Sequence, residues 1–358
     1  MRAMRAVVFE EYGGAATVQQ VPDPVAPPHG VVVRVEATGL CRSDWHAWAG
    51  HERGIPLPHV PGHELAGVVT EVGGAVTRWQ AGDRVTVPFV CACGTCRECV
   101  SGNQQVCDRQ TQPGFTGWGS FAELVALHHA DVNLVALPDE LDMPTAAALG
   151  CRFATAYRAV LAQGRAAPGE WVAVHGCGGV GLSAVMIAVA AGARVVAVDV
   201  RPAALLLAQE LGAEVVLDAG RTENVGSAVR AATGGGVHLS LDALGSAETM
   251  GASVRSLRKR GRHVQVGLLP PSLGEPTVAM SRVIAHELEI LGSHGMAAHA
   301  YDEMLALVAS GRLRPQRLVT RHIGLEEAGA ALAGMGQPGQ EAGVTVVLPA
   351  ASPARAGV

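Results

Sequence analysis

The chain has 358 residues, of which 45 are glycine, 49% are hydrophobic and only 16% are charged. This balance excludes an intrinsically disordered protein, which needs high charge and low hydrophobicity, and the length favours about two domains. The formal net charge of −5 argues against nucleic acid as the main partner. The one concentrated basic run, residues 255–262, is expected to be a solvated turn after a helix.

Short valine-rich runs, separated by turns rich in glycine and proline, fill roughly the first 140 residues. Runs of this kind predict the strands of an irregular, mainly β domain. The expected strands cover residues 6–9, 30–36, 67–72 and 83–87. An alanine-rich pattern over residues 143–164 then predicts a helix that ends at a glycine.

Strand-like and helical stretches alternate beyond residue 170. The expected strands cover residues 171–175, 194–199, 214–218, 239–243, 261–267 and 287–292, and helices are expected over 182–191 and 203–211. Strands separated by helices predict an α/β fold with a doubly wound, parallel sheet. Toward the C-terminus the pattern predicts helices over 299–309 and 325–335 and a last strand over 343–348.

Residues 171–193 contain no Asp, Glu, Lys or Arg, and this uncharged stretch is long enough to cross a membrane. Four glycines in its first half favour a buried strand, a tight turn and a buried helix instead. The N-terminal segment lacks the apolar core of a signal peptide. We therefore expect a soluble, cytoplasmic protein without a membrane partner.

The segment after the expected strand 171–175 has the pattern G-x-G-x-x-G, which is typical of the phosphate-binding turn of a dinucleotide fold. A glycine-rich turn with a purely structural role is the alternative. The residues expected to contact a dinucleotide here are Gly176, Gly178, Gly179, Val180 and Gly181.

Asp199 ends the next expected strand, 18 residues beyond Gly181. A carboxylate at this place binds the hydroxyls of the adenosine ribose and repels a 2′-phosphate. The sequence therefore favours NAD over NADP as the cofactor. Arg201, two residues further on, would weaken that preference.

Five of the eight cysteines lie within residues 91–107. Four of them have the spacing C-x2-C-x2-C-x7-C, namely Cys93, Cys96, Cys99 and Cys107. Four thiolates at this spacing predict a closed, tetrahedral structural zinc site. A redox or iron–sulfur role is the alternative, and Cys91 is expected to remain a free thiol.

Three further residues are candidates for a second metal site. Cys41 and His63 offer a thiolate and an imidazole, and Cys151 on the expected helix would complete a Cys2His set. Three protein ligands leave the fourth position of zinc open, which distinguishes a catalytic site from a structural one.

These motifs together resemble the zinc-containing, medium-chain alcohol dehydrogenases. The pattern G-H-E-x2-G-x5-G-x2-V begins at Gly62, and the segment C-R-S-D-W-H covers residues 41–46. With the four-cysteine lobe and the glycine-rich turn, these segments occur in that family's order, and the resemblance extends from about residue 5 to residue 348. It implies a GroES-like catalytic domain over residues 1–150 with a zinc lobe at about 91–108, a Rossmann domain over 151–292, and a return to the catalytic domain over 293–358.

The resemblance also implies roles for single residues. Cys41, His63 and Cys151 would hold the catalytic zinc, with Glu64 as an occasional or outer ligand. A cysteine at the third position, where polyol-dehydrogenase relatives commonly have glutamate, indicates the branch that acts on simple alcohols.

The segment 41–46 would supply the groups around the reacting atoms. The resemblance implies that Ser43 accepts the alcohol proton and passes it through the nicotinamide ribose to His46 at the surface. Asp44 would orient His63 through its second ring nitrogen. Arg42 would bind the cofactor pyrophosphate.

The implied activity is hydride transfer between NAD(H) and a small or medium primary or secondary alcohol, or the matching aldehyde or ketone. The implied cofactors are NAD and two zinc ions per subunit, in a homodimer or homotetramer. The alternatives are a relative specialised for an amino-alcohol, a polyol or formaldehyde, and a zinc-stabilised nucleotide-binding protein without catalysis.

Five aromatic residues near the zinc segments either line an apolar substrate pocket or fill the core of the catalytic domain. They are Trp45, Trp48, Phe89, Phe115 and Trp118. Leu268 is expected to reach toward the cofactor and this pocket from the nucleotide domain. The family often has an arginine near the C-terminal strand as a second pyrophosphate contact, but residues 340–344 contain none. We therefore expect either weaker cofactor binding or a substitute residue.

Overall fold

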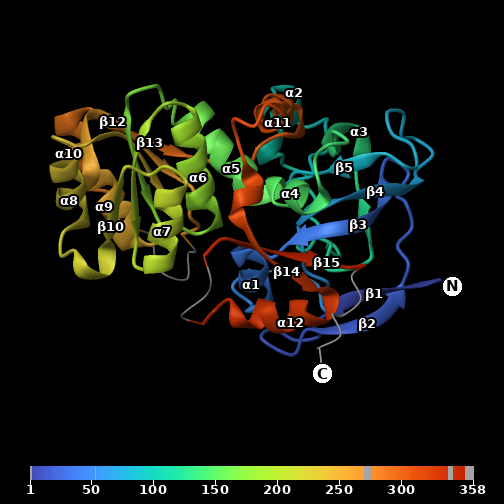
Figure 1. Cartoon of the computed structure of the whole chain (residues 1–358). Coiled ribbons are helices and arrows are strands. Elements are labelled where there is room, and N and C mark those ends of the chain that lie inside the picture. Colours follow the sequence, from blue (N-terminus) through green and yellow to red (C-terminus); the bar gives the residue numbers. More distant parts are fainter. Residues whose placement is uncertain (1, 53, 270–275, 338–341, 351–358) are drawn as a thin grey trace.

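Two large sheets and the helices packed on them organise the protein (Figure 1). The computed structural model describes residues 2–52, 54–269, 276–337 and 342–350. In Figure 1 the parallel sheet with its helices lies on the left and the mixed sheet on the right, with α4 and α5 between them.

A six-stranded, fully parallel sheet has the strand order β10-β9-β8-β11-β12-β13. Its strands are β8 (Trp171–His175), β9 (Arg194–Asp199), β10 (Val215–Asp218), β11 (Val237–Asp242), β12 (Leu257–Gln265) and β13 (Glu289–Gly292). Its helices are α6 (Gly179–Ala190), α7 (Pro202–Glu210), α8 (Val225–Ala232), α9 (Ala247–Ser256) and α10 (Met280–His286). In chain order this arrangement is 3-2-1-4-5-6, the Rossmann order. The predicted doubly wound sheet is confirmed.

Alternating side chains explain why both faces of this sheet are covered. On β8, Val172 and Val174 pack into the core that includes α6, whereas Trp171 and Ala173 pack with residues of α8 and α9. Successive side chains of a strand point to opposite faces, so an almost continuously apolar strand needs a layer of helices on each side.

The second large sheet is mixed and has the order β14-β15-β3-β4-β5-β7, with β6 also paired to β3. Its strands are β3 (Val31–Gly39), β4 (Glu64–Val72), β5 (Arg84–Thr86), β6 (Leu124–Leu127), β7 (Val135–Ala136), β14 (Val319–Gly324) and β15 (Val344–Leu348). A separate antiparallel pair joins β1 (Ala3–Val8) to β2 (Thr17–Pro22). The late strand β15 pairs with the early strand β3, so the two ends of the chain build one sheet.

The helical connection between the two sheets is less regular than the single helix that the sequence predicts. It consists of α4 (Met143–Ala147) and α5 (Ala154–Tyr157), with π-helical turns over Leu149–Phe153 and Arg158–Gln163. One hydrophobic core runs from Ala37 and Ala66 of the mixed sheet through this connection to the parallel sheet. The remaining helices are α1 (Arg42–Trp48), α2 (Arg97–Val100), α3 (Ala130–Asn133), α11 (Tyr301–Ala309) and α12 (Leu325–Gly334).

The fold places the uncharged stretch and the basic run of the sequence. Among the described residues, no helix combines the length and apolar character that a membrane crossing requires. Most of the basic run is exposed as expected, but Arg262 is partly buried against Glu170, and the run is not a turn after a helix. Residues 258–260 lie inside β12, where the pairing with β11 jumps from Leu257 to Arg262. This irregularity leaves the charged side chains in solvent while the flanking residues stay paired.

The last residue of β8, His175, makes the stability of the fold sensitive to acid. Its side chain is 1% exposed, and its Nε2 has no hydrogen-bond partner among the described residues. Burial, together with the charges of His263 and Arg255, lowers the pKa of His175 to about 3. Between pH 6.5 and pH 3 the unfolded imidazole therefore binds a proton that the folded one does not, and stability falls as the pH falls.

We expect this histidine to cost about 1.4 kcal/mol of unfolding free energy per pH unit below pH 6.5. Urea unfolding of the wild type and of His175→Leu at pH 7 and pH 5 measures the effect. The wild type should lose about 2 kcal/mol more than the variant between these two values. Acid effects on all other groups are common to both proteins and cancel in the comparison. Equal losses would show that another group dominates the acid sensitivity.

Candidate active site and metal centres

Four side chains from three separate parts of the chain converge beside β3 and β4. The ligand atoms of Cys41, His63, Glu64 and Cys151 all lie within 4.8 Å of one another. Cys41 follows β3 as the N-cap of α1, His63 and Glu64 lie at the start of β4, and Cys151 lies in a π-helical turn. Such turns occur frequently at functional sites, because they re-aim single side chains within a helix.

A fully buried carboxylate, Asp44, holds this cluster in place. Its Oδ1 lies 2.8 Å from Nδ1 of His63 and accepts the backbone N–H of Gly62 at 3.0 Å, and its Oδ2 accepts the N–H of Cys41 at 3.0 Å. One side chain thus caps the first turn of α1 and fixes the orientation of the His63 ring.

The second ring nitrogen of His63, Nε2, indicates that a ligand such as a metal ion binds here. His63 is 1% exposed, yet its Nε2 has no hydrogen-bond partner among the described residues. A buried polar atom without a partner is costly, and a soft metal ion bound by Nε2 and two thiolates would satisfy it. The donor set of two sulfurs and one imidazole therefore fits zinc.

The charges around the cluster favour metal binding. A hydrogen bond with Cys151 lowers the pKa of the Cys41 thiol well below its ordinary value, and the same bond raises the pKa of Cys151. Burial alone would lower the pKa of His63, but Asp44 and Cys41 outweigh it and raise that pKa. A metal that binds Nε2 and the second sulfur must therefore displace protons, so its affinity rises with pH.

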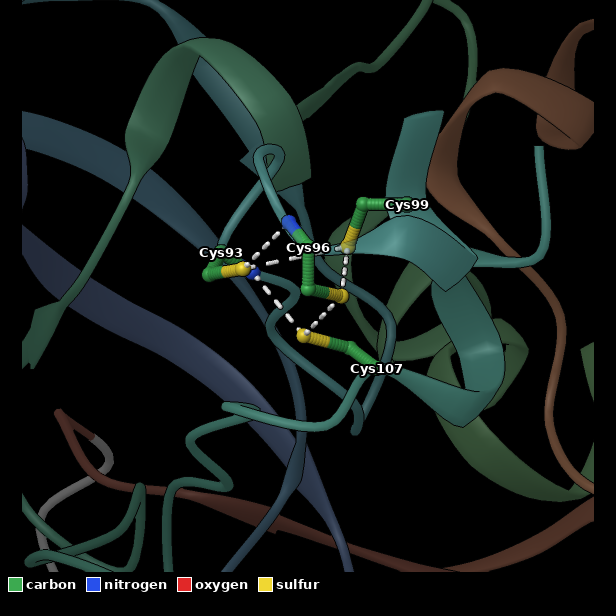
Figure 2. A group of neighbouring side chains, drawn as sticks. All are labelled: Cys93, Cys96, Cys99 and Cys107. Carbon is green, nitrogen blue, oxygen red and sulfur yellow. Dashed lines mark hydrogen bonds between the residues drawn. The ribbon is translucent and has the colours of Figure 1, made fainter. Parts of the chain in front are cut away.

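The four predicted lobe cysteines form a second, closed cluster (Figure 2). Their sulfurs point toward a common centre, with Sγ–Sγ distances of 3.4 Å for Cys96–Cys99, 3.7 Å for Cys96–Cys107 and 4.0 Å for Cys93–Cys99. Tetrahedral zinc with Zn–S bonds of about 2.3 Å separates its sulfurs by about 3.8 Å. The lobe therefore has the dimensions of a structural zinc site.

Backbone N–H groups donate to the sulfurs of the lobe, as they do in metal–thiolate sites. Sγ of Cys93 accepts the N–H groups of Thr95 at 3.5 Å and Cys96 at 3.4 Å. These donors, with the Thr95 hydroxyl, lower the pKa of Cys93 to about 5 against the effect of burial. Sγ of Cys107 likewise accepts the N–H groups of Cys93 and Arg109, each at 3.3 Å. The loop thus stabilises the thiolate of Cys93 before any metal binds, whereas burial raises the pKa of Cys107 despite its donors.

The glycine-rich turn connects β8 to α6 at the carboxyl edge of the parallel sheet. Gly176 has a φ of +91°, a conformation that favours glycine. A Cβ on Gly181 would lie 1.8 Å from the carbonyl oxygen of Gly176, so only glycine lets the helix approach the strand. A Cβ on Gly178 would meet nothing within 4 Å, and Val180 belongs to the first turn of α6. Open space therefore remains beside Gly178, the N-cap of α6, as phosphate binding requires.

Asp199, at the end of β9, lies directly beside this turn. Its Oδ2 accepts the N–H of Cys177 at 2.6 Å, and its Oδ1 accepts the N–H of Arg201 at 2.9 Å and Nε–H of the same residue at 3.1 Å. Burial would raise the pKa of Asp199, but these donors outweigh it and lower the pKa. The predicted ribose-binding carboxylate is thus ionised, and Arg201 is paired with it.

Helix α1 presents the remaining residues of the segment 41–46. The Ser43 hydroxyl lies 3.8 Å from Sγ of Cys41. Nδ1 of His46 lies 2.9 Å from Nδ1 of the exposed His51, a neighbour that the sequence did not single out. The exposed Arg42 stacks on the Trp45 ring and donates to the carbonyl oxygen of Met335 at 2.8 Å.

The five predicted pocket aromatics occupy different surroundings. The rings of Phe115 and Phe89 approach the His63 ring edge-on, with centroid distances of 5.3 and 6.3 Å. Trp45 lies against the rings of His46 and His51.

The other two tryptophans are anchored elsewhere. Trp48 packs on the core beneath α12, and its indole N–H donates to the carbonyl oxygen of Gly14 at 2.8 Å. Trp118 is 37% exposed and donates to the carbonyl oxygen of Pro58. Leu268 is 51% exposed and follows β12 close to Gly245. The structure thus brings Phe89 and Phe115 to the metal cluster, whereas Trp48 has the surroundings of a core residue.

Arg152 is the main residue of the site that the sequence analysis missed. It follows Cys151 directly and is 7% exposed, and its Nε donates to Oε1 of Glu64 at 2.8 Å while Nη2 pairs with Oε2. The only hint in the sequence is that Arg152 is one of two charged residues in a mainly apolar helical stretch, the other being Arg158. Tyr301 of α11 was also missed, and its hydroxyl donates to the carbonyl oxygen of Gly150 at 3.1 Å.

The fold and the two ligand clusters together define a zinc-binding dehydrogenase. Residues 27–139 match the family profile of the alcohol dehydrogenase GroES-like domain, and residues 179–310 match that of the zinc-binding dehydrogenases. An alcohol dehydrogenase of Geobacillus stearothermophilus is 36% identical over 313 residues, which cover 87% of this chain and 90% of the relative.

Solved structures agree over almost the whole chain. An alcohol dehydrogenase from Thermus sp. ATN1 superposes with a TM-score of 0.86 at 36% identity, over 96% of this chain and 99% of that one. A putative zinc-binding dehydrogenase from Sinorhizobium meliloti 1021, solved with NADP, has a TM-score of 0.87 at 29% identity, over 98% of this chain and all of that one. The chain belongs to the zinc-containing, medium-chain alcohol dehydrogenases.

Proposed function

We propose that the protein is an NAD-dependent alcohol dehydrogenase with two zinc ions per subunit, which interconverts small or medium alcohols with their aldehydes or ketones. The observation that carries this proposal is the unpartnered Nε2 of buried His63, placed between two thiols and fixed by Asp44. Cys41, His63 and Cys151 would hold a catalytic zinc with one open position, and Cys93, Cys96, Cys99 and Cys107 a structural one. When bound, the catalytic zinc supplies Lewis-acid polarisation of the substrate oxygen.

The chain's own residues would perform the remaining tasks. The edges of Phe89 and Phe115 against His63 form an apolar wall that orients a substrate and excludes water. The Ser43 hydroxyl, which lies close to Cys41, would accept the alcohol proton. His46, which contacts the exposed His51, would release that proton to solvent.

Asp199 is the basis for proposing NAD rather than NADP. In Asp199→Gly the carboxylate that repels a 2′-phosphate is lost, and Arg201 loses its partner and becomes free to bind that phosphate. We expect the ratio of kcat/KM for NAD to that for NADP to fall by about 10- to 100-fold. Steady-state kinetics with both cofactors measure this ratio, with Asp218→Gly on the neighbouring strand as the control. An unchanged ratio would place the ribose contact elsewhere.

A panel of alcohols and carbonyl compounds, tested with NAD(H) and NADP(H) and combined with zinc analysis of the purified protein, tests the whole proposal. We expect turnover with NAD(H), two zinc ions per chain and a homodimer or homotetramer in light scattering. A specialised relative would act on only an amino-alcohol, a polyol or formaldehyde. Zinc and NADH binding without turnover on any substrate would instead support a non-catalytic nucleotide-binding protein.

A further inference from the structure

Arg152 lies between the catalytic cluster and the glycine-rich turn. On one side it meets Glu64, which is fully buried and whose Oε1 also accepts the backbone N–H of Arg152 at 3.1 Å. Both Nε and Nη2 of the guanidinium are used by the two carboxylate oxygens. A buried carboxylate requires such a partner, and the planar fork of arginine matches it at two points.

On its other side the arginine touches the turn that binds the cofactor. A Cβ on Gly179 would lie 2.4 Å from Cδ and 3.2 Å from Nη1 of Arg152, so the arginine stem packs directly on this glycine. Gly179 occupies a position where the G-x-G-x-x-G pattern requires no particular residue. Its lack of a side chain is therefore explained by the approach of Arg152.

One nitrogen of the guanidinium is left over. Within the described part of the chain, Nη1 has no hydrogen-bond acceptor. Unlike Nε2 of His63, however, Nη1 is not fully buried. It therefore keeps access to solvent beside Gly179, at the N-terminus of α6. This is the end of the helix to which a pyrophosphate binds in this fold.

The C-terminal region of the sequence does not supply the second phosphate donor that the family often has. Residues 340–344 lack the arginine that the family often uses as a second pyrophosphate contact. Residues 340 and 341 lie outside the described residues, and neither 340 nor 341 is an arginine. The predicted first contact, Arg42, is on α1, a different element from Arg152.

We propose that Arg152 is the missing second contact: its Nη1 binds the cofactor pyrophosphate while Nε and Nη2 hold Glu64. The inference rests on the proposed function, because it assumes that a dinucleotide binds at the glycine-rich turn. Arg152 would thus connect the metal centre, through Glu64, to the pyrophosphate of the cofactor. A charge-assisted arginine–phosphate bond of this kind is strong and directional.

Calorimetric titration with NADH, ADP-ribose and AMP tests this assignment without measuring turnover. NADH and ADP-ribose carry the pyrophosphate, and AMP retains only the adenosine end with one phosphate. In Arg152→Gln we expect the Kd for NADH and ADP-ribose to rise by about 10- to 100-fold, and the Kd for AMP to stay within about twofold. Arg158→Gln, on the same helical connection with its Nη1 3.3 Å from Oγ of Ser293, is the matched control and should bind like the wild type.

In Arg152→Gln the Glu64 carboxylate loses its partner, and its free charge could itself weaken pyrophosphate binding. The double variant Glu64→Gln/Arg152→Gln removes this charge, so any remaining loss of affinity is due to the missing arginine–phosphate bond. We expect it to keep the loss of affinity. Recovered NADH affinity in the double variant, or unchanged ADP-ribose affinity in the single one, would overturn the inference and leave the proposed function standing. A wild type that binds neither NADH nor ADP-ribose would overturn both. If the glutamine variants do not fold, Arg152→Lys replaces them, because it keeps a cation beside Glu64. Its single ammonium group cannot bind Glu64 and the pyrophosphate through separate nitrogens, so we expect it to lose ADP-ribose affinity too.

Discussion

Replacing Cys41 by alanine is expected to lower kcat/KM for alcohol oxidation by about 10⁴-fold or more, while NADH binding and the fold are retained. Only His63 and Cys151 would then remain as strong ligands, and the polarisation of the substrate oxygen, which amounts to several kcal/mol, would be lost with the metal. The alanine itself is small and lies at the N-cap of α1, where it leaves the hydrogen bonds of Asp44 to the backbone in place.

Zinc analysis, NADH titration and steady-state kinetics on the same preparation measure this outcome. We expect zinc to fall from two ions per chain to one. Cys91→Ala is the matched control, because Cys91 is equally buried but lies outside both ligand clusters and contacts the carbonyl oxygen of Pro88. Normal turnover in Cys41→Ala would show that Cys41 does not bind a catalytic zinc.

The largest effect on stability is expected from Cys107→Ala in the four-cysteine lobe. The buried cluster of this lobe consists of the four cysteines and Ala92, with only Val132 packed against it. Because so little apolar surface is buried there, the metal rather than a hydrophobic core holds the loop together. Loss of one ligand should remove one zinc ion and lower the Tm by about 5 to 10 °C.

Calorimetry and limited trypsin digestion detect the change. Arg97 and Arg109 are exposed on the lobe, and we expect both to become cleavage sites once the loop opens. Val100→Ala is the control, since Val100 is on the same lobe but is 74% exposed. If the Tm and the zinc content of Cys107→Ala equal those of the wild type, the lobe is held by contacts other than a metal.

Local patterns predicted those parts of the fold that depend on neighbouring residues. The strands at 171–175 and 194–199 are observed with the predicted bounds, because each is a short apolar run that ends at a glycine turn or a carboxylate. The helix after the turn begins at Gly179, three residues before the predicted start. Glycine is a poor helix former, so the glycines of the turn do not predict a helix start at Gly179. The first turn of α6 instead exposes backbone N–H groups that can bind phosphate.

The features that the sequence could not predict depend on contacts between distant residues. Arg152 and Glu64 are 88 positions apart, and their pairing follows only from the packing of the helical connection on β4. The Tyr301 hydroxyl likewise reaches the carbonyl oxygen of Gly150, inside the π-helical turn around Cys151, from 151 positions away. The set Cys41, His63 and Cys151, in contrast, was expected chiefly from the family resemblance. Residue type alone would also have allowed other buried residues, such as Cys177, His59 and His175.

The pairing of β15 with β3 determines the order in which the protein can assemble during synthesis. All six strands of the parallel sheet emerge from the ribosome before β14 and β15, so this sheet can form while the mixed sheet still lacks its last two strands. Until residues 344–348 are made, Thr38 and Gly39 at the end of β3 lack their partner on one edge, although β6 already pairs with residues 31–34, and this open end can pair with another nascent chain. Truncation just before β15 should therefore yield a chain with a folded nucleotide-binding half and an aggregation-prone catalytic half.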